Sequence, residues 1–121
     1  MSEIFIGVDI EDISRIRSVI QTSGNKFLNR VYTNKEQIYC QKKADPAIHF
    51  AGRFCAKEAL IKALKSSGIE EHIPWKAIEI DSTESRKPEV NLSDNYNGIS
   101  QVSISHTETQ AIAFALFYTK L

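Results

Sequence analysis

The chain has 121 residues, of which 42% are hydrophobic and 25% charged, and its 15 basic and 15 acidic residues cancel. This length and composition are typical of one soluble globular domain spanning residues 1–121. A net charge of zero excludes bulk electrostatic attraction to nucleic acid, so a charged partner would have to be recognised by a local patch.

The remaining bulk features favour a cytoplasmic protein without a membrane partner. The longest apolar run, 111–118, is too short to span a bilayer. We expect no signal peptide, because no basic segment followed by a long apolar one opens the chain. Cys40 and Cys55 belong to no metal-binding motif and are therefore expected to be reduced thiols.

Hydrophobic periodicity predicts one strand and three helices in the first part of the chain. Apolar residues alternate over 4–10, which indicates a strand. Helical spacing predicts a helix from about 13 to a stop at Gly24. A capping-box pattern opens a short helix over about 33–41, and an Asp-Pro pair opens a long one over about 45–66.

The second part of the chain is predicted to form strands. Two weaker strands are predicted over 77–81 and 89–92, with a turn between them. The segments 100–106 and 111–118 have the spacing of an antiparallel hairpin, and the second is apolar on both faces, so we expect it to be central. The order β-α-α-α-β-β-β-β predicts an α+β fold, a mainly antiparallel sheet with a long central helix packed on it.

Two acidic residues lie where burial is expected. Asp9 follows an apolar stretch of strand, and Glu58 lies beside the apolar stripe of the long helix. An unpaired buried charge costs several kcal/mol (about 3–5) or forces protonation, so both acids need a partner. Mg²⁺ would suit them, since it takes one or two carboxylates together with waters and phosphate oxygens. Glu11, on the same strand face as Asp9, can join directly or through water.

Simpler interpretations exist for each of these residues. Asp9 can cap the turn after its strand, and Glu58 can form an ordinary surface ion pair with Lys62 one helical turn on. Ser105 and His106 point to opposite faces of a strand, so they cannot act together as nucleophile and base. Two interpretations of His106 stay open: a contact to a phosphate or a purine, and a structural histidine, which the pattern alone favours.

Three segments together resemble a known family. They are 7–16 (GVDIEDISRI), 50–64 (FAGRFCAKEALIKAL) and 102–107 (VSISHT). In order and spacing they are similar to the N-terminal signature, the central helix motif and the C-terminal strand motif of the holo-(acyl-carrier-protein) synthases. These are small 4′-phosphopantetheinyl transferases, and the resemblance covers essentially the whole chain.

The resemblance implies a reaction. Coenzyme A would donate its 4′-phosphopantetheine arm to a serine of apo acyl carrier protein and release adenosine 3′,5′-bisphosphate, in support of fatty acid biosynthesis. Asp9 and Glu58 match the Mg²⁺ ligands of the family, and the metal would neutralise the pyrophosphate. Glu58 and Lys62 are then the expected catalytic residues, with Glu58 or a metal-bound water as the base for the serine proton.

Further positions follow from the same resemblance. Arg15 matches a contact to the acidic carrier protein, and Arg17 is expected to assist it. The small members of the family are homotrimers whose active sites lie between subunits. The residues implied to contact coenzyme A are Arg53, Lys62, Pro88, Ser105 and His106.

Two segments depart from the family pattern. The glycine-rich stretch after the central motif reads KSSGI at 65–69, and the G-K-P turn reads RKP at 86–88. Both belong to the coenzyme A pocket in relatives, so the details of nucleotide contact stay open, as does the choice of carrier protein or acyl-coenzyme A. A non-catalytic trimeric module and a metal-dependent phosphohydrolase are the alternatives, and the presence of Asp9, Glu58 and Lys62 argues against the first.

Overall fold

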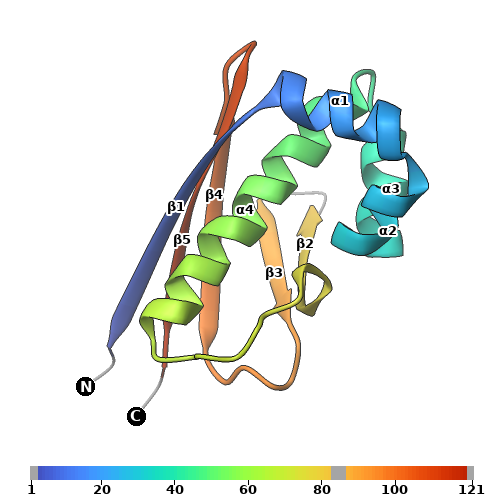
Figure 1. Ribbon diagram of the computed structural model, residues 1–121. Helices are drawn as coiled ribbons and strands as arrows, with labels where there is room; N and C mark the ends of the chain where they lie inside the picture. The colour runs from blue at the N-terminus through green and yellow to red at the C-terminus, as the bar shows by residue number, and fades with distance from the viewer. Residues whose placement is uncertain (1–2, 83–86, 120–121) are drawn as a thin grey trace.

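The computed structural model describes residues 3–82 and 87–119. Helices and strands follow one another in the α+β order that the sequence predicts, with two additional short helical elements, one of them a 3-10 helix (Figure 1). Their bounds are β1 Ile4–Asp12, α1 Ile13–Ser23, α2 Asn25–Val31, α3 Asn34–Gln41, α4 Pro46–Ser66, the 3-10 helix η1 Trp75–Ala77, β2 Ile78–Ser82, β3 Pro88–Leu92, β4 Ile99–His106 and β5 Gln110–Tyr118.

The strands form two antiparallel sheets. The larger has the order β1-β5-β4, so the strand that is apolar on both faces is central, as predicted. In the described part of the chain, β2 and β3 pair only with each other, which divides the single sheet expected from the sequence into two. Helix α4 lies between the larger sheet and a second layer formed by β2, β3 and the helices α1 to α3 (Figure 1).

Because α4 has neighbours on several sides, most of its residues are buried and it lacks a distinct polar face. It approaches β1 backbone to backbone: a Cβ added to Gly7 would lie 1.9 Å from the carbonyl oxygen of Ala59. Only glycine permits this contact, which brings the strand that carries Asp9 against the helix that carries Glu58.

Two local features differ from the sequence prediction, and a third agrees with it. Helix α2 was missed because Gly24 was read as the end of helical structure; here its φ of 50° forms a bend between two helices. Leu28 and Val31 on α2 are buried, and their spacing was the available signal. Strand β1 continues to Asp12, so Asp9 lies within the strand and does not cap a turn. The capping box of Thr33 and Glu36 is confirmed.

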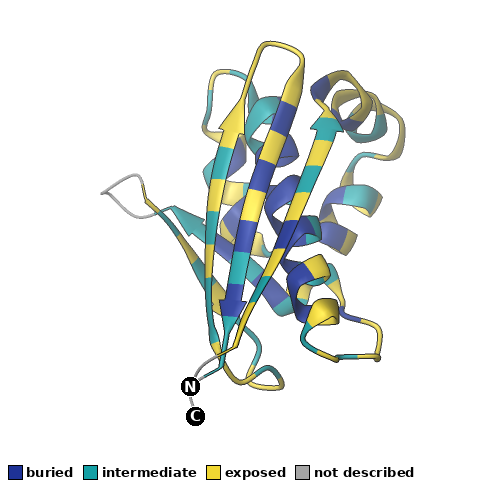
Figure 2. Ribbon diagram, turned by 90° about the vertical axis from the view of Figure 1, so that its left-hand side faces the viewer, coloured by how far each residue is buried: buried dark blue, intermediate teal, exposed yellow. Residues whose placement is uncertain are grey.

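The two faces of the larger sheet differ. One packs on α4, while the other exposes apolar side chains with no covering layer among the described residues (Figure 2). Strict alternation along β1 causes this, because Phe5, Gly7 and Asp9 face the helix. The exposed apolar residues of this face are Ile4, Ile6, Val8, Ile10, Ile112 and Phe114. Within the described ranges, no helix is both long and apolar enough to cross a membrane.

Candidate active site

Asp9 lies in the middle of β1, opposite Ala113 of the central strand, with its carboxylate directed toward α4. Its side chain is only 12% exposed, and Oδ1 accepts a hydrogen bond from Lys62 Nζ at 3.3 Å. The same ammonium group donates to the carbonyl oxygen of Val8 at 2.9 Å. Oδ2 of Asp9 is buried and has no hydrogen-bond partner among the described residues. Since buried polar atoms are nearly always paired, this oxygen needs an explanation.

Glu58 has a different partner from the one that its spacing suggests. Its Oε1 accepts a hydrogen bond from the indole Nε1 of Trp75 at 2.9 Å, while Lys62, one turn on, pairs with Asp9. The simple ion pair between Glu58 and Lys62 is therefore not formed in the described structure. Trp75, at the start of η1, was not predicted as a site residue, and no local pattern in the sequence links it to Glu58.

Glu11 shows that the three acids share one electrostatic environment. Burial raises the pKa of Glu11, and the negative charges of Asp9 and Glu58 raise it further, whereas Arg15 lowers it. Burial and the charges of Asp9 and Glu11 likewise raise the pKa of the Cys55 thiol to about 12, which keeps this cysteine protonated. Mutually repelling carboxylates are stabilised by a cation.

A divalent cation fits this set of donors. The unpaired Oδ2 of Asp9 and the carboxylate of Glu58 are hard oxygen ligands of the kind that Mg²⁺ prefers. Within the described residues, no group of three or more His, Cys, Asp and Glu side chains could hold a metal ion. The donors are thus those of a site completed by water or by a phosphate ligand.

A second polar cluster surrounds Arg53. This side chain is only 4% exposed, so it is buried within the packed part of α4. Its guanidinium stacks on Tyr39 at 4.1 Å and donates from Nη2 to Ser82 Oγ at 2.5 Å, while its buried Nε has no partner within residues 3–82 and 87–119. Ser82 is in turn opposite Pro88 in the pairing of β2 with β3.

Positive charge gathers near Arg53. Lys43 Nζ lies 4.5 Å from the centre of the same Tyr39 ring. Burial lowers the pKa of His49, and Arg53, Lys43 and His106 lower it further through their charges. Such a concentration of cationic groups favours binding of an anion.

Ser105 and His106 are separated, as expected for neighbours in a strand. His106 is opposite Ala111 on the face of the sheet that packs on α4, and its Nδ1 contacts the carbonyl oxygen of Thr107 at 3.0 Å. Ser105 is opposite Ile112, on the exposed apolar face. Ser105 therefore does not join the Asp9 site of its own chain.

The two arginines of α1 have distinct surroundings. Arg15 is 76% exposed, and its closest acidic contact is Glu11 at 3.8 Å. Arg17 forms two hydrogen bonds with Asp45, at 2.8 and 2.9 Å, and these hold the pKa of Asp45 below its usual value. Arg15 is thus the more available of the two for an acidic partner.

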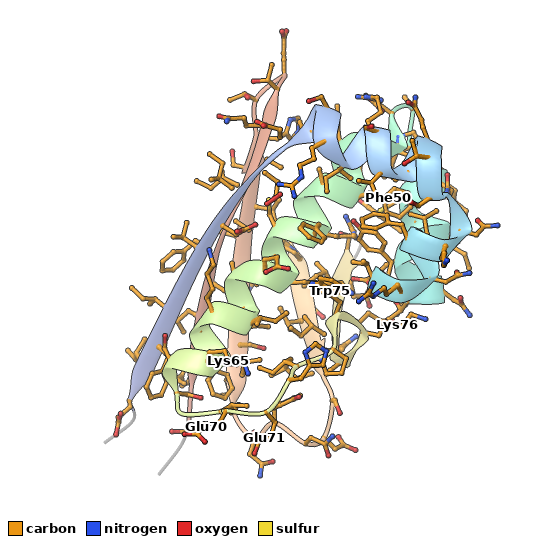
Figure 3. All side chains as sticks on the ribbon, viewed as in Figure 1. Phe50, Lys65, Glu70, Glu71, Trp75 and Lys76 are labelled. Carbon is orange, nitrogen blue, oxygen red and sulfur yellow. The ribbon has the colours of Figure 1, made fainter. Side chains whose placement is uncertain are left out.

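The segments that depart from the family pattern lie at the end of α4 and before β3. Lys65 Nζ donates to the carbonyl oxygens of Glu70 and Glu71 and so holds the loop after the helix (Figure 3). Arg86 lies outside the described residues. Pro88 lines a hollow of about 370 Å³ between β3 and β4.

Comparison with known proteins identifies the class that this fold and site define. The profile of the 4′-phosphopantetheinyl transferase superfamily matches residues 5–115. A holo-[acyl-carrier-protein] synthase of Chlamydia pneumoniae is 49% identical over 96% of this chain and 98% of its own, and one of Chlorobaculum parvum is 47% identical over 92% and 95%. The chain belongs to the 4′-phosphopantetheinyl transferase superfamily, among its holo-[acyl-carrier-protein] synthases.

Solved structures agree with this assignment. The holo-(acyl-carrier-protein) synthase of Bacillus anthracis in complex with coenzyme A (3′,5′-ADP) has a TM-score of 0.81 and 30% identity and covers 96% of both chains. That of Helicobacter pylori in complex with coenzyme A has a TM-score of 0.81 and 32% identity and covers 93% of this chain and 98% of its own. The fold class and the enzyme class predicted from the sequence are confirmed.

Proposed function

We propose that this chain transfers the 4′-phosphopantetheine arm of coenzyme A to a serine of apo acyl carrier protein, with Mg²⁺ bound by Asp9 and Glu58. The observation that carries the proposal is the buried, unpartnered Oδ2 of Asp9, which lies beside Lys62 and in one electrostatic environment with Glu58 and Glu11. Relatives solved with coenzyme A support the same substrate here.

The chain's own groups account for the chemistry of transfer. When bound, Mg²⁺ would supply positive charge to neutralise the pyrophosphate and the charge that develops on the leaving phosphate. Lys62, 55% exposed, can turn its ammonium group from Asp9 to a phosphate oxygen at small cost, because a partly exposed ion pair is weak. Glu58, whose carboxylate is held by Trp75, is the candidate acceptor of the serine proton.

The cluster around Arg53 suits the charged parts of coenzyme A. The stacked guanidinium is fixed by Tyr39 and Ser82, and Lys43 lies on the same aromatic ring. A fixed planar guanidinium binds phosphate well, since it offers several parallel donors. Pro88 lines the adjoining hollow, and His106 contributes to the electrostatic environment of His49 in this cluster.

We also propose a homotrimer in which the exposed face of the larger sheet is covered by neighbouring copies of this chain. Six apolar side chains of β1 and β5 lie exposed there, and such a patch marks an interaction surface. Ser105 lies on this same face, so in an assembly it would serve a site shared with another subunit. Light scattering after gel filtration should give three times the mass of the chain, and a monomer would contradict the trimer alone.

Arg15 is proposed to bind the acidic carrier protein. Its exposed guanidinium on α1 is near the Asp9 site, because it contacts Glu11 of the same sheet face. We further propose that the chain acts as one domain in the cytoplasm and that the modified carrier protein serves fatty acid biosynthesis.

The proposal is tested by incubation of the protein with coenzyme A, Mg²⁺ and an apo acyl carrier protein, followed by intact-mass measurement. A gain of one phosphopantetheine on the carrier, absent when a chelator replaces Mg²⁺, is the expected result. Release of phosphate products without a mass gain would favour hydrolysis. Binding of the carrier without either product would favour a non-catalytic module.

A further inference from the structure

Trp75 links the candidate metal site to the core of the protein. It lies in the connection between α4 and β2, yet its indole Nε1 lies 2.9 Å from Oε1 of Glu58. An indole N–H only donates a hydrogen bond, so its partner must be an acceptor. The contact therefore orients the carboxylate of Glu58, because it occupies one oxygen and leaves the other for a further ligand.

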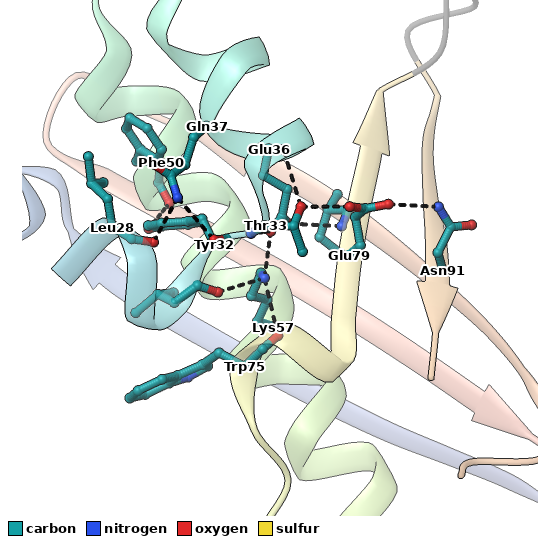
Figure 4. A network of polar contacts seen from close by, with 12 residues as sticks. Leu28, Tyr32, Thr33, Glu36, Gln37, Phe50, Lys57, Trp75, Glu79 and Asn91 are labelled. Atoms are coloured by element: carbon teal, nitrogen blue, oxygen red, sulfur yellow. Dashed lines mark hydrogen bonds and ion pairs between the residues drawn. The ribbon is translucent and has the colours of Figure 1, made fainter. Parts of the chain in front are cut away.

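Trp75 is itself held in place from both ends. The buried ammonium of Lys57 donates to its backbone carbonyl oxygen at 3.1 Å (Figure 4). On the ring side, Phe54 lies at 5.9 Å between centroids and the guanidinium of Arg30 lies 5.6 Å from the ring centre. A side chain fixed at its backbone and on its ring holds a steady direction for its N–H group.

Lys57 in turn is anchored in the core. Its Nζ lies 2.7 Å from Glu36 Oε1 and 2.8 Å from the carbonyl oxygen of Val31, and the side chains of Lys57 and Glu36 are fully buried (Figure 4). Lys57 and Glu58 are neighbours on one helix that both reach the same tryptophan, one at its backbone and the other at its ring. Polar contacts thus connect Glu36 to Glu58 by way of Lys57 and Trp75.

We infer that Trp75 is a positioning residue for Glu58: its N–H group holds the carboxylate in the orientation that binds the metal. This inference rests on the proposed function, in which Glu58 is a metal ligand. Groups that hydrogen-bond to metal ligands typically contribute about 10–100-fold to metal affinity. A purely structural role would instead require only the aromatic ring.

Trp75→Phe separates these two roles, because phenylalanine keeps an aromatic ring in contact with Phe54 and lacks the donor. We expect the dissociation constant for Mn²⁺, measured by calorimetry and by electron paramagnetic resonance with coenzyme A present and no carrier protein, to rise about 10–100-fold. The Mg²⁺ concentration for half-maximal transfer should rise similarly, with kcat at saturating Mg²⁺ changed much less. Arg30→Gln is the matched control, since it removes a ring contact and leaves the indole N–H; its Mn²⁺ affinity should stay at the wild-type value.

A second variant tests the same N–H group in case Trp75→Phe does not fold. Trp75 is the sole tryptophan of the chain, so growth with β-(benzothien-3-yl)alanine would replace it alone with an analogue of nearly the same shape that lacks the N–H group. The same loss of Mn²⁺ affinity is expected. Wild-type affinity in either folded variant would overturn the positioning role and leave the proposed function intact. Absence of Mn²⁺ binding by the wild-type protein, or its retention in Glu58→Gln, would overturn both.

Discussion

Two lysines of helix α4, five residues apart, show how one helix separates stability from function. Lys57 and its partner Glu36 are fully buried, and every donor contact of the ammonium is met by a protein oxygen (Figure 4). Lys62 is half-exposed, and its partner Asp9 retains an oxygen that no donor of the described residues reaches. A complete network specifies the fold, whereas an incomplete one at the surface leaves capacity for a ligand.

Glu36 makes the contrast stronger, because its carboxylate joins three elements. It accepts hydrogen bonds from the backbone N–H groups of Thr33 and Ile80 as well as from Lys57. Burial lowers the pKa of Lys57, and Glu36 opposes this shift through its charge and hydrogen bond. The pair therefore connects α3, α4 and β2, and loss of either member would leave a buried charge without its partner.

The largest expected effect is on catalysis. Asp9→Asn keeps the size of the side chain and removes the charge, so we expect transfer to fall by roughly 10³-fold or more. The free energy of unfolding should change by less than about 1 kcal/mol, because the ion pair that is lost, with Lys62, is half-exposed. Intact-mass kinetics and urea unfolding measure the two quantities. Full activity in this variant would exclude Asp9 as a metal ligand.

The largest expected effect on stability comes from Lys57→Met, which leaves Glu36 buried without its cation. We expect a loss of about 3–5 kcal/mol in the free energy of unfolding, measured by urea denaturation. Lys62→Met is the matched control on the same helix and should cost less than about 1 kcal/mol, because that ion pair is half-exposed. Equal losses of stability in the two variants would contradict the proposal that Lys57 stabilises the fold whereas Lys62 serves the site.

A smaller effect is expected at the edge of the buried network. Thr33 Oγ1 accepts from the backbone N–H of Glu36 and donates to Glu79 Oε2 at 2.6 Å. Thr33→Ala removes the cap of α3, which should cost about 1 kcal/mol in the free energy of unfolding. Transfer per folded molecule should be unchanged at saturating coenzyme A, since Thr33 has no contact with the Asp9 site. A loss of transfer without a loss of stability would show that the two regions are coupled.

The smallest effect is expected for Arg17→Ala, which tests an ion pair on the surface. Arg17 lowers the pKa of Asp45, first through its hydrogen bond and then through its charge. A carboxyl group whose folded-state pKa is lowered adds stability above its ordinary pKa and loses it as pH falls through the folded value. In Arg17→Ala the pKa of Asp45 should rise toward its ordinary value, as measured by NMR titration, and less stability should be lost in acid. An unchanged pKa would show that the ion pair is not formed in solution.

Much of the fold follows from local pattern. The capping box at Thr33 and the apolar central strand β5 were both predicted, because each depends on spacing within a few residues. Helix α2 was missed, although Leu28 and Val31 have helical spacing, since Gly24 can end a helix or bend the chain between two. The division into two sheets depends on contacts between distant strands, which local pattern does not report.

Apart from helix α2 and the short η1, the sequence by itself determined the order of the elements, the enzyme class and the acidic residues that merit attention, because periodicity, capping and motif spacing are properties of short segments. Only the tertiary structure decided which partners those residues have. Lys57 and Glu58 are adjacent in the sequence, yet one enters the core toward Glu36 and the other meets Trp75. The physical reason is that burial and hydrogen bonding are set by residues 17 to 21 positions away, which folding alone brings within reach.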